Sequence, residues 1–386
     1  MRRARRAADE APRRRSIHRR RFIVMVALLA AAVRLLPSVG AGAQLAATSR
    51  AAAESEKRWA KIPGGEGTVC SQGGPYSFYF RTASPDKLMV YFQGGGACWR
   101  YGNCDLGQQP TYDPAVDAGD DPKPSGIFDL GNAGNPLADY SVLFLPYCTG
   151  DVHLGDKEAV YSGAASPGAG DTGAARSVRI HHNGYRNAMA AIEWASARVK
   201  APSDVFVAGE SAGAIATPFY ADRLADRYPK ARVVQLGDSG GGYRSPAVPG
   251  LLEAWGAIEV LRRFAFNVPS DTSAIRFETL YTATARNHPT IRLAQVNTAE
   301  DETQVFFLAQ IGMPNAVLDP LLERNYADIR AASPAFRAFT ASGKVHVILR
   351  RPQFYSLEAG GVRLRDWVAG LVAGRRVDDV PATRDK

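Results

Sequence analysis

The segment from Asp204 to Gly213, which reads D-V-F-V-A-G-E-S-A-G, constrains the fold of this chain more than any other. Val205 to Ala208 form a short apolar, β-branched run, which is typical of a strand buried on both faces. A G-x-S-x-G pentapeptide follows at once, and a helix-compatible segment continues to Arg227. This order predicts a strand, a sharp turn and a helix, with Ser211 raised above the sheet at the turn. Chance alone gives about 0.2 such pentapeptides in a chain of this length, so other features must support it.

Further strand-like runs alternate with segments of helical periodicity. Strands are predicted at residues 77–80, 87–92, 140–146, 232–236, 291–296 and 336–340. Helices are predicted over residues 183–199 and 362–372, with a largely helical insertion over 249–288. Two polar, Gly-rich stretches, 105–137 and 149–176, are predicted to be loops. Alternating strands and helices predict an α/β fold with a mostly parallel central sheet covered by helices on both faces.

The net charge of +9 suggests a nucleic-acid-binding protein until the charges are located along the chain. Residues 1–43 hold 11 arginines and two acidic residues, whereas the remainder holds 36 basic and 36 acidic residues. The excess positive charge therefore belongs to the N-terminus, and we expect no nucleic-acid partner.

The N-terminus has the pattern of an export signal. An Arg-rich region ends at Arg21, an apolar run extends from Phe22 to Val33, and Ala41-Gly42-Ala43 forms an A-x-A cleavage site. Arg19-Arg20-Arg21-Phe22 also resembles a twin-arginine export motif. Cleaved export to the periplasm or the medium is favoured over a retained anchor, because the apolar run is short for a membrane span.

This interpretation divides the chain into four parts and predicts no stable membrane association after cleavage. They are a signal peptide (1–43), a flexible leader (44–58), a catalytic domain (59–374) and a polar C-terminal tail (375–386).

Four cysteines, at positions 70, 98, 104 and 148, bear on metal binding and on disulfides. They contain no C-x-x-C pair and have no histidine pair nearby at zinc spacing, so we expect no metal and no cofactor. In an exported chain an even number of cysteines favours two disulfides. The sequence alone allows three pairings.

A serine at such a turn requires an acid and then a histidine later in the chain. Of the six histidines only His346 follows every candidate acid, and it lies in a loop after the last predicted strand. Asp238 and Asp301 each follow a strand. Asp301 is favoured because it follows the later strand, where it would orient His346 and stabilise the imidazolium ion.

Hydrogen-bond donors for an oxyanion are also predicted. The amide of Ala212, directly after the serine, is the first donor. Gly94-Gly95-Gly96 follows the strand at 87–92, and residues without side chains let backbone N–H groups crowd toward a substrate oxygen. Trp99, just beyond this turn, is a candidate substrate-binding residue.

Together these motifs resemble the pectin acetylesterase/Notum family of α/β-hydrolases. That family combines an L-E-G-G-x-x-C turn, a G-x-S-A-G turn, a D-[AS]-G turn, an N-x-x-x-D-x-x-Q acid loop and a late histidine. The present chain shows the corresponding motifs in the same order between residues 65 and 370: 93–98, 209–213, 238–240, 297–304 and His346.

The resemblance implies an α/β-hydrolase fold and a secreted, monomeric serine esterase that acts through an acyl-enzyme. It implies Ser211, Asp301 and His346 as the triad, Gly95, Gly96 and Ala212 as oxyanion donors, and the disulfides Cys70–Cys148 and Cys98–Cys104. Gln93, Ala97 and the segment 240–243 depart from the family pattern near the substrate site. The expected substrate is an O-acetyl or other short acyl ester, with an acylated polysaccharide such as pectin as one candidate.

Three alternatives remain at this stage. A lipase or polyester-type esterase would act on longer acyl chains. A hydrolase-like protein would bind polysaccharide without turnover. Two short motifs, Asp171-Thr172-Gly173 and Asp238-Ser239-Gly240, imitate the signatures of aspartic proteases, but they lie too close in sequence for the two lobes of those enzymes.

Overall fold

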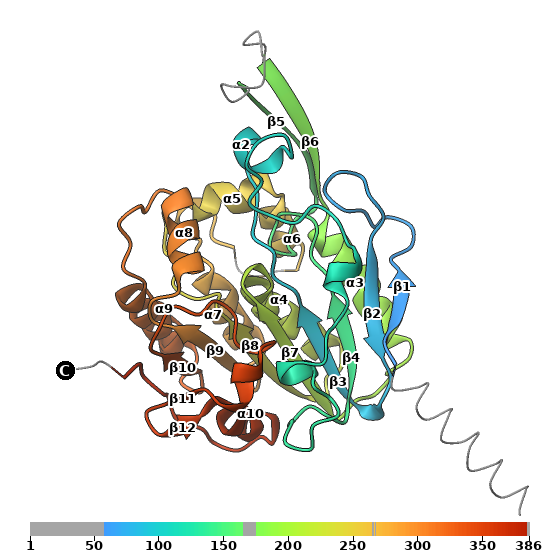
Figure 1. Ribbon diagram of the computed structural model, residues 1–386, viewed down its shortest axis with the longest axis vertical. Coiled ribbons are helices and arrows are strands. Elements are labelled where there is room, and N and C mark those ends of the chain that lie inside the picture. The colour runs from blue at the N-terminus through green and yellow to red at the C-terminus, as the bar shows by residue number, and fades with distance from the viewer. Residues whose placement is uncertain (1–57, 165–174, 265, 267, 384–386) are drawn as a thin grey trace, which may run out of the picture. The chain divides into compact units, whose positions relative to one another are not determined.

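The computed structural model describes residues 58–164, 175–264, 266 and 268–383 (Figure 1). The predicted signal peptide lies outside these residues, as does the predicted leader except for Arg58. In the part of the chain that is described, no helix is both long enough and apolar enough to cross a membrane.

An eight-stranded sheet organises the structure, in the order β1-β2-β4-β3-β7-β8-β9-β10 (Figure 1). Strands β4, β3, β7, β8, β9 and β10 pair in parallel with one another, whereas β2 pairs antiparallel with both β4 and the edge strand β1. The predicted α/β class with a mostly parallel sheet is confirmed. The strands of this sheet are β1 (Ala60–Pro63), β2 (Ser77–Arg81), β3 (Ser84–Phe92), β4 (Tyr140–Leu145), β7 (Asp204–Glu210), β8 (Arg232–Asp238), β9 (Arg292–Thr298) and β10 (Arg337–Ala341).

The helices connect and cover these strands. The α-helices are α2 (Tyr101–Cys104), α3 (Gly184–Ser196), α4 (Ala212–Arg227), α5 (Val248–Ala254), α6 (Ala257–Arg263), α7 (Glu278–Asn287), α8 (Glu302–Gln310), α9 (Leu318–Ala332) and α10 (Leu364–Val372). The 3₁₀ turns are η1 (Ala118–Asp120), η2 (Gly126–Phe128), η3 (Thr272–Ala274) and η4 (Pro352–Tyr355). A small hairpin, β11 (Glu358–Ala359) and β12 (Val362–Arg363), precedes α10.

The central strand β7 shows why both faces of the sheet are buried. Successive side chains of a strand point to opposite faces. Val205 and Val207 pack in one core cluster with residues of α3, α4, α7 and α9. Phe206 and Ala208 pack in a second cluster with residues of η2, η4 and α10. A strand apolar at every position is therefore what this layered arrangement requires.

One predicted loop is in fact partly a hairpin. Within 149–176, residues 157–164 form β5 (Lys157–Ala164), which pairs antiparallel with β6 (Ala175–His182) beside α2 (Figure 1). Tyr161, Val178 and Ile180 pack on a small cluster around Cys98 and Cys104. The strands were missed because they bury side chains on this satellite cluster and not in the main core.

The C-terminal segment is attached to the last strand. Val380 bridges Phe339 of β10 in parallel register. The amide of Thr340 donates to the carbonyl of Val380 at 2.7 Å, and the amide of Val380 donates to the carbonyl of Ala338 at 2.8 Å. The segment thereby covers the outer edge of β10 and satisfies backbone groups that an edge strand would otherwise expose.

Candidate active site

Ser211 lies at the turn between β7 and α4, as the sequence predicts. Its backbone has φ 52° and ψ −121°, a conformation that residues other than glycine rarely adopt. The turn is tight because helix α4 begins directly over β3: a Cβ at Gly213 would lie 2.2 Å from the carbonyl oxygen of Phe92. Strain of this kind is typical of functional positions held by their surroundings.

His346 and Asp301 form a hydrogen-bonded pair. Nδ1 of His346 lies 2.7 Å from Oδ2 of Asp301, whose side chain is fully buried, whereas the imidazole remains 18% exposed. The other carboxylate oxygen of Asp301 accepts from the amides of Thr303 and Gln304 and caps helix α8. With Nδ1–H donating to the carboxylate, Nε2 is the lone-pair nitrogen available as a base. Asp301, not Asp238, is therefore the carboxylate that is hydrogen-bonded to His346.

The three triad candidates come from one edge of the sheet. Glu210, Asp238 and Val296 lie in register at the carboxyl ends of β7, β8 and β9, and Thr298 pairs with Ala341 of β10. Ser211 follows β7, Asp301 follows β9 and His346 follows β10. In parallel sheets this edge is where ligands bind.

The Gly94–Gly96 turn follows β3 and packs against the serine turn. A Cβ at Gly94 would lie 2.8 Å from Cβ of Ser211. Gly96 has φ 78°, and a Cβ there would lie 1.9 Å from the carbonyl oxygen of Thr111, so only glycine fits. Ala212 begins α4 beside this turn. The predicted oxyanion donors Gly95, Gly96 and Ala212 thus lie on two segments in direct contact.

His153 supports the Gly turn from within the core, a role that the sequence did not suggest. Its Nε2 lies 2.8 Å from the carbonyl oxygen of Gln93, and the residue is 2% exposed. Burial lowers the pKa of this imidazole to about 4, so the ring is neutral at pH 7 and donates Nε2–H to that carbonyl. The sequence carried no signal for this role because His153 lies in an irregular Gly-rich segment.

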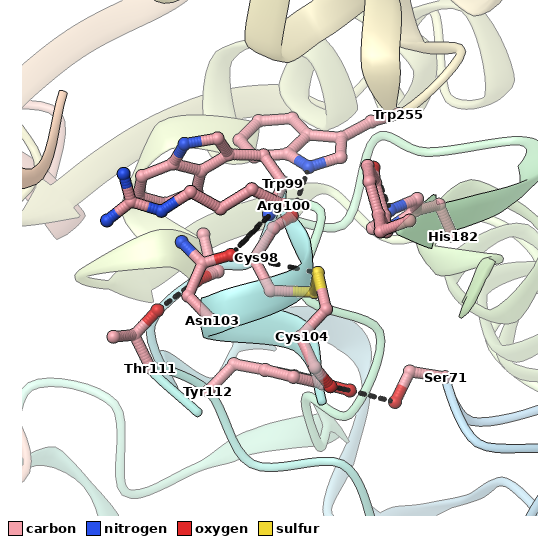
Figure 2. The surroundings of a disulfide bond; sticks show 12 residues. Ser71, Cys98, Trp99, Arg100, Asn103, Cys104, Thr111, Tyr112, His182 and Trp255 are labelled. Carbon is pink, nitrogen blue, oxygen red and sulfur yellow. Dashed lines mark hydrogen bonds between the residues drawn. A yellow bond between two sulfur atoms is a disulfide. The ribbon is translucent and has the colours of Figure 1, made fainter. Parts of the chain in front are cut away.

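Both disulfides have the predicted pairing, Cys70–Cys148 and Cys98–Cys104. The shorter bridge, shown in Figure 2, begins at Cys98, two residues after Gly96. The backbone of Cys98 donates its N–H to the carbonyl of Gly150 at 2.9 Å and accepts Nε1–H of Trp255 at 2.7 Å. Asn103 closes the same loop, because its side-chain oxygen accepts the amides of Trp99 and Arg100, each at 3.0 Å. The bridge and these bonds fix the chain directly after Gly96.

We predict that removing the short bridge lowers kcat more than removing the long bridge does, although it costs less stability. From loop entropy, we expect the free energy of unfolding to fall by about 2.4 kcal/mol in the Cys98→Ser/Cys104→Ser double variant and by about 4.5 kcal/mol in Cys70→Ser/Cys148→Ser. We nevertheless expect the larger fall in kcat, about 10-fold, in the first variant, because its bridge adjoins the Gly turn. Melting temperatures and kcat of both variants test this. A larger kcat loss in the Cys70/Cys148 variant would contradict it.

An apolar pocket opens beside Ser211. It has a volume of about 40 Å³, room for about three waters at 10–15 Å³ each. Trp99, the predicted substrate-binding residue, lines it together with Gly96 and Ala212. Tyr243, Phe277, Phe307 and Ile311 also line it and were not predicted. They come from the insertions after β8 and β9, where apolar residues at helical spacing are indistinguishable from ordinary core positions.

One group of side chains in the described part of the chain has metal-ligand geometry. Candidate ligand atoms of Asp222, Asp226 and His288 lie within 4.8 Å of one another. Arg223 contacts both carboxylates, so a cation already occupies the electrostatic role that a metal would take. This cluster is an ion-pair network on the far part of α4 and separate from the Ser211 pocket.

Comparison with known proteins adds a family assignment. A family model described as Pectinacetylesterase matches residues 53–246. The matched segment spans half of the chain and contains all four cysteines, the Gly turn and Ser211, whereas Asp301 and His346 follow it. No curated protein matches the sequence.

Proposed function

Because this chain belongs to the pectinacetylesterase family, whose members are carboxylic ester hydrolases, we propose that it hydrolyses O-acyl esters through a Ser211–Asp301–His346 triad. The observation that carries the proposal is the 2.7 Å hydrogen bond between His346 and Asp301, on the sheet edge where Ser211 occupies its strained turn. A serine and an oriented histidine on that edge are the requirements of acyl transfer.

The mechanism proceeds in two steps. Nε2 of His346 accepts the proton of Ser211 as Oγ attacks the ester carbonyl carbon, and the N–H groups of Gly95, Gly96 and Ala212 stabilise the oxyanion. His346 then returns the proton to the departing alcohol, which leaves an acyl-serine. Water, deprotonated by His346, then attacks the acyl carbonyl carbon, and His346 returns this proton to Oγ of Ser211 as the acid departs. Throughout, Asp301 stabilises the imidazolium ion.

For the substrate we propose an acetyl or similarly short acyl group on a carbohydrate. The pocket beside Ser211 holds only a few non-hydrogen atoms without rearrangement. Its lining, almost entirely apolar apart from Ser211, favours a second candidate, a longer alkyl or aromatic acyl group for which Phe307 and Ile311 would move aside. The two candidates make opposite predictions about acyl chain length.

A series of p-nitrophenyl esters from acetate to palmitate separates these candidates. We expect kcat/KM to be highest for acetate to butyrate and at least 10-fold lower beyond eight carbons, because each further methylene must be placed outside the pocket. Release of acetate from acetylated pectin, compared with acetylated xylan, tests the carbohydrate. A preference for long chains would replace the short-acyl proposal with the second candidate, and no turnover of any ester would favour a polysaccharide-binding protein.

We also propose that the chain is exported and acts as a monomer. The two disulfides are typical of oxidising compartments, and the N-terminal pattern of residues 1–43 is that of an export signal. Sequencing the N-terminus of the protein from the culture medium tests cleavage after Ala43. Size-exclusion chromatography with light scattering tests the oligomeric state.

A further inference from the structure

We propose that Asp238 is a positioning residue that holds the histidine loop over Ser211. The inference rests on the proposed function, because it concerns the placement of His346 as the base. Asp238 itself bonds neither His346 nor Ser211 through its side chain, and its carboxylate is fully buried at the end of β8.

The contacts of Asp238 converge on the residues directly after His346. Its Oδ2 accepts the amides of Ile348 and Leu349, both at 2.7 Å. Its Oδ1 accepts the hydroxyl of Ser239 at 3.0 Å, and that hydroxyl oxygen accepts the amide of Val347 at 2.9 Å. Two adjacent side chains thus bind three consecutive N–H groups of the histidine loop.

The loop needs such a restraint because of Val347. This β-branched residue has φ 63°, in a region that such side chains rarely adopt. A strained residue keeps its conformation only where surrounding contacts determine it. The direction in which the chain leaves His346 depends on this residue, so the three N–H bonds also fix the orientation of the imidazole.

The same short segment joins the other two parts of the site through its backbone. The carbonyl of Asp238 accepts the amide of Ser211 at 2.8 Å, and the amide of Ser239 donates to the carbonyl of Val296 at 2.8 Å. Val296 lies on β9, the strand that leads to Asp301. Segments carrying the nucleophile, the acid and the base therefore meet at one dipeptide.

The charge on Asp238 makes this arrangement pH-dependent. Burial, and to a smaller extent the nearby Glu210, raises the pKa of the carboxyl to about 6, although the hydrogen bonds from Leu349, Ile348 and Ser239 act to lower it. The charged or titratable groups around it are Glu210 of β7, Tyr91 of β3 and Arg350, which pairs with Glu210 at 2.6 Å. Above about pH 6 the carboxylate is a strong acceptor for the loop amides, and below it the neutral acid is a weaker one.

A raised carboxyl pKa also has a consequence for stability with a definite sign. The charged form is less favourable in the folded protein than in the unfolded chain, so ionised Asp238 destabilises the fold above about pH 6. That penalty disappears as the pH falls below the unfolded pKa of about 4. A positioning role explains why the protein keeps this destabilising charge. A purely structural role does not explain it.

Asp238→Asn tests the proposal, with Asp222→Asn as the matched control. Asp222 is another fully buried aspartate, but it lies on α4 away from the sheet edge, where it pairs with Arg223 of α4 and Asn287 of α7. We expect Asp238→Asn to lower kcat on p-nitrophenyl acetate about 10- to 100-fold, with KM unchanged and no fall in Tm at pH 7.5. Asp222→Asn should show the opposite, a lower Tm with kcat retained.

The pH profile gives a second readout. In the wild type, log kcat/KM should fall more steeply between pH 6 and 4 than in Asp238→Asn, because the Asp238 carboxyl, whose pKa is raised to about 6, takes up a proton in this range. In Asp238→Asn this additional fall should be absent. Wild-type kcat in Asp238→Asn, or a kcat loss that follows Tm as in a simple folding defect, would overturn the proposal.

Two further variants keep the outcomes distinguishable. Should Asp238→Asn fail to fold, Ser239→Ala removes the acceptor for the Val347 amide and the hydroxyl donor to Asp238 but leaves the bonds of Asp238 to Ile348 and Leu349. We expect it to lower kcat about 3-fold, and an unchanged kcat would count against the proposal. Ser211→Ala tests the proposed function itself. If Ser211→Ala retains wild-type activity, the triad is wrong. If Ser211→Ala loses activity but Asp238→Asn and Ser239→Ala keep it, only the role of Asp238 is refuted.

Discussion

Ser211→Ala is expected to lower kcat on p-nitrophenyl acetate by at least about 10⁴-fold, with little change in KM or Tm. The variant removes the attacking oxygen but leaves the Gly turn, Ala212 and the apolar pocket, so residual turnover would come from oxyanion stabilisation alone. Ser211 is 8% exposed, and alanine fits the same space. Steady-state kinetics and a fluorophosphonate probe, which should label the wild type at Ser211 and leave the variant unlabelled, measure the effect.

Ser141→Ala provides the matched control for this experiment. Ser141 is a serine of β4 with 1% exposure, and its hydroxyl donates to the carbonyl of Ser84 at 2.7 Å and accepts the amide of Ala83 at 2.9 Å. Losing these bonds should lower Tm by a few degrees without changing kcat. Equal activity of Ser211→Ala and Ser141→Ala, or labelling at another residue, would rule out Ser211 as the nucleophile.

Backbone strain in this protein gathers at the proposed active site. Among the described residues, those other than glycine with positive φ are Val152, His153, Ser211, Ser239 and Val347. Each lies in a segment that follows a strand of the parallel sheet at its carboxyl edge. Val152 lines the pocket, and the others carry or brace the Gly turn, the nucleophile and the base. These strained conformations, which weaken the fold, thus occur around the site where we propose that ester hydrolysis takes place.

The fold was predictable from sequence where burial on both faces leaves a simple signature. Runs such as Val205–Ala208 read as parallel strands because each side chain meets one of two cores. The short edge strand β1 was missed because it is mostly exposed and carries no apolar run. Helices α8 and α9 were not predicted either. Helix α8 begins within the motif at residues 297–304 and buries only Gln304 and Leu308, so its sequence shows little helical periodicity.

The site was predictable only in part, for a related physical reason. Chain order predicted Ser211, Asp301 and His346, and the three do follow strands of the parallel sheet at a common edge, where Asp301 and His346 are hydrogen-bonded. Asp238 appeared only as a rival acid, since hydrogen bonds to the amides of Ile348 and Leu349 have no sequence pattern. Phe307 and Ile311 looked like core residues because a pocket wall and a core have the same apolar composition.

Asp301→Asn is expected to lower kcat by about 10³- to 10⁴-fold while leaving Tm within about 2 °C of the wild type. The carbonyl of asparagine can replace Oδ1 and still accept the amides of Thr303 and Gln304, and asparagine caps helices as well as aspartate does. The new NH₂ group would face Nδ1 of His346 in place of Oδ2. It donates where a carboxylate accepts, so the imidazole must take the tautomer with its proton on Nε2, which cannot accept the proton of Ser211.

Comparison with Asp301→Ala separates this tautomer effect from the loss of the helix cap. Alanine removes both carboxylate oxygens, so α8 loses its cap at a cost of about 1 kcal/mol, and Tm should fall by a few degrees. Since neither variant holds the productive tautomer, both should show similarly low kcat despite their different stabilities. If kcat instead follows Tm in the two variants, or if Asp301→Asn keeps near wild-type activity, then Asp301 serves only to begin α8 and another group orients His346.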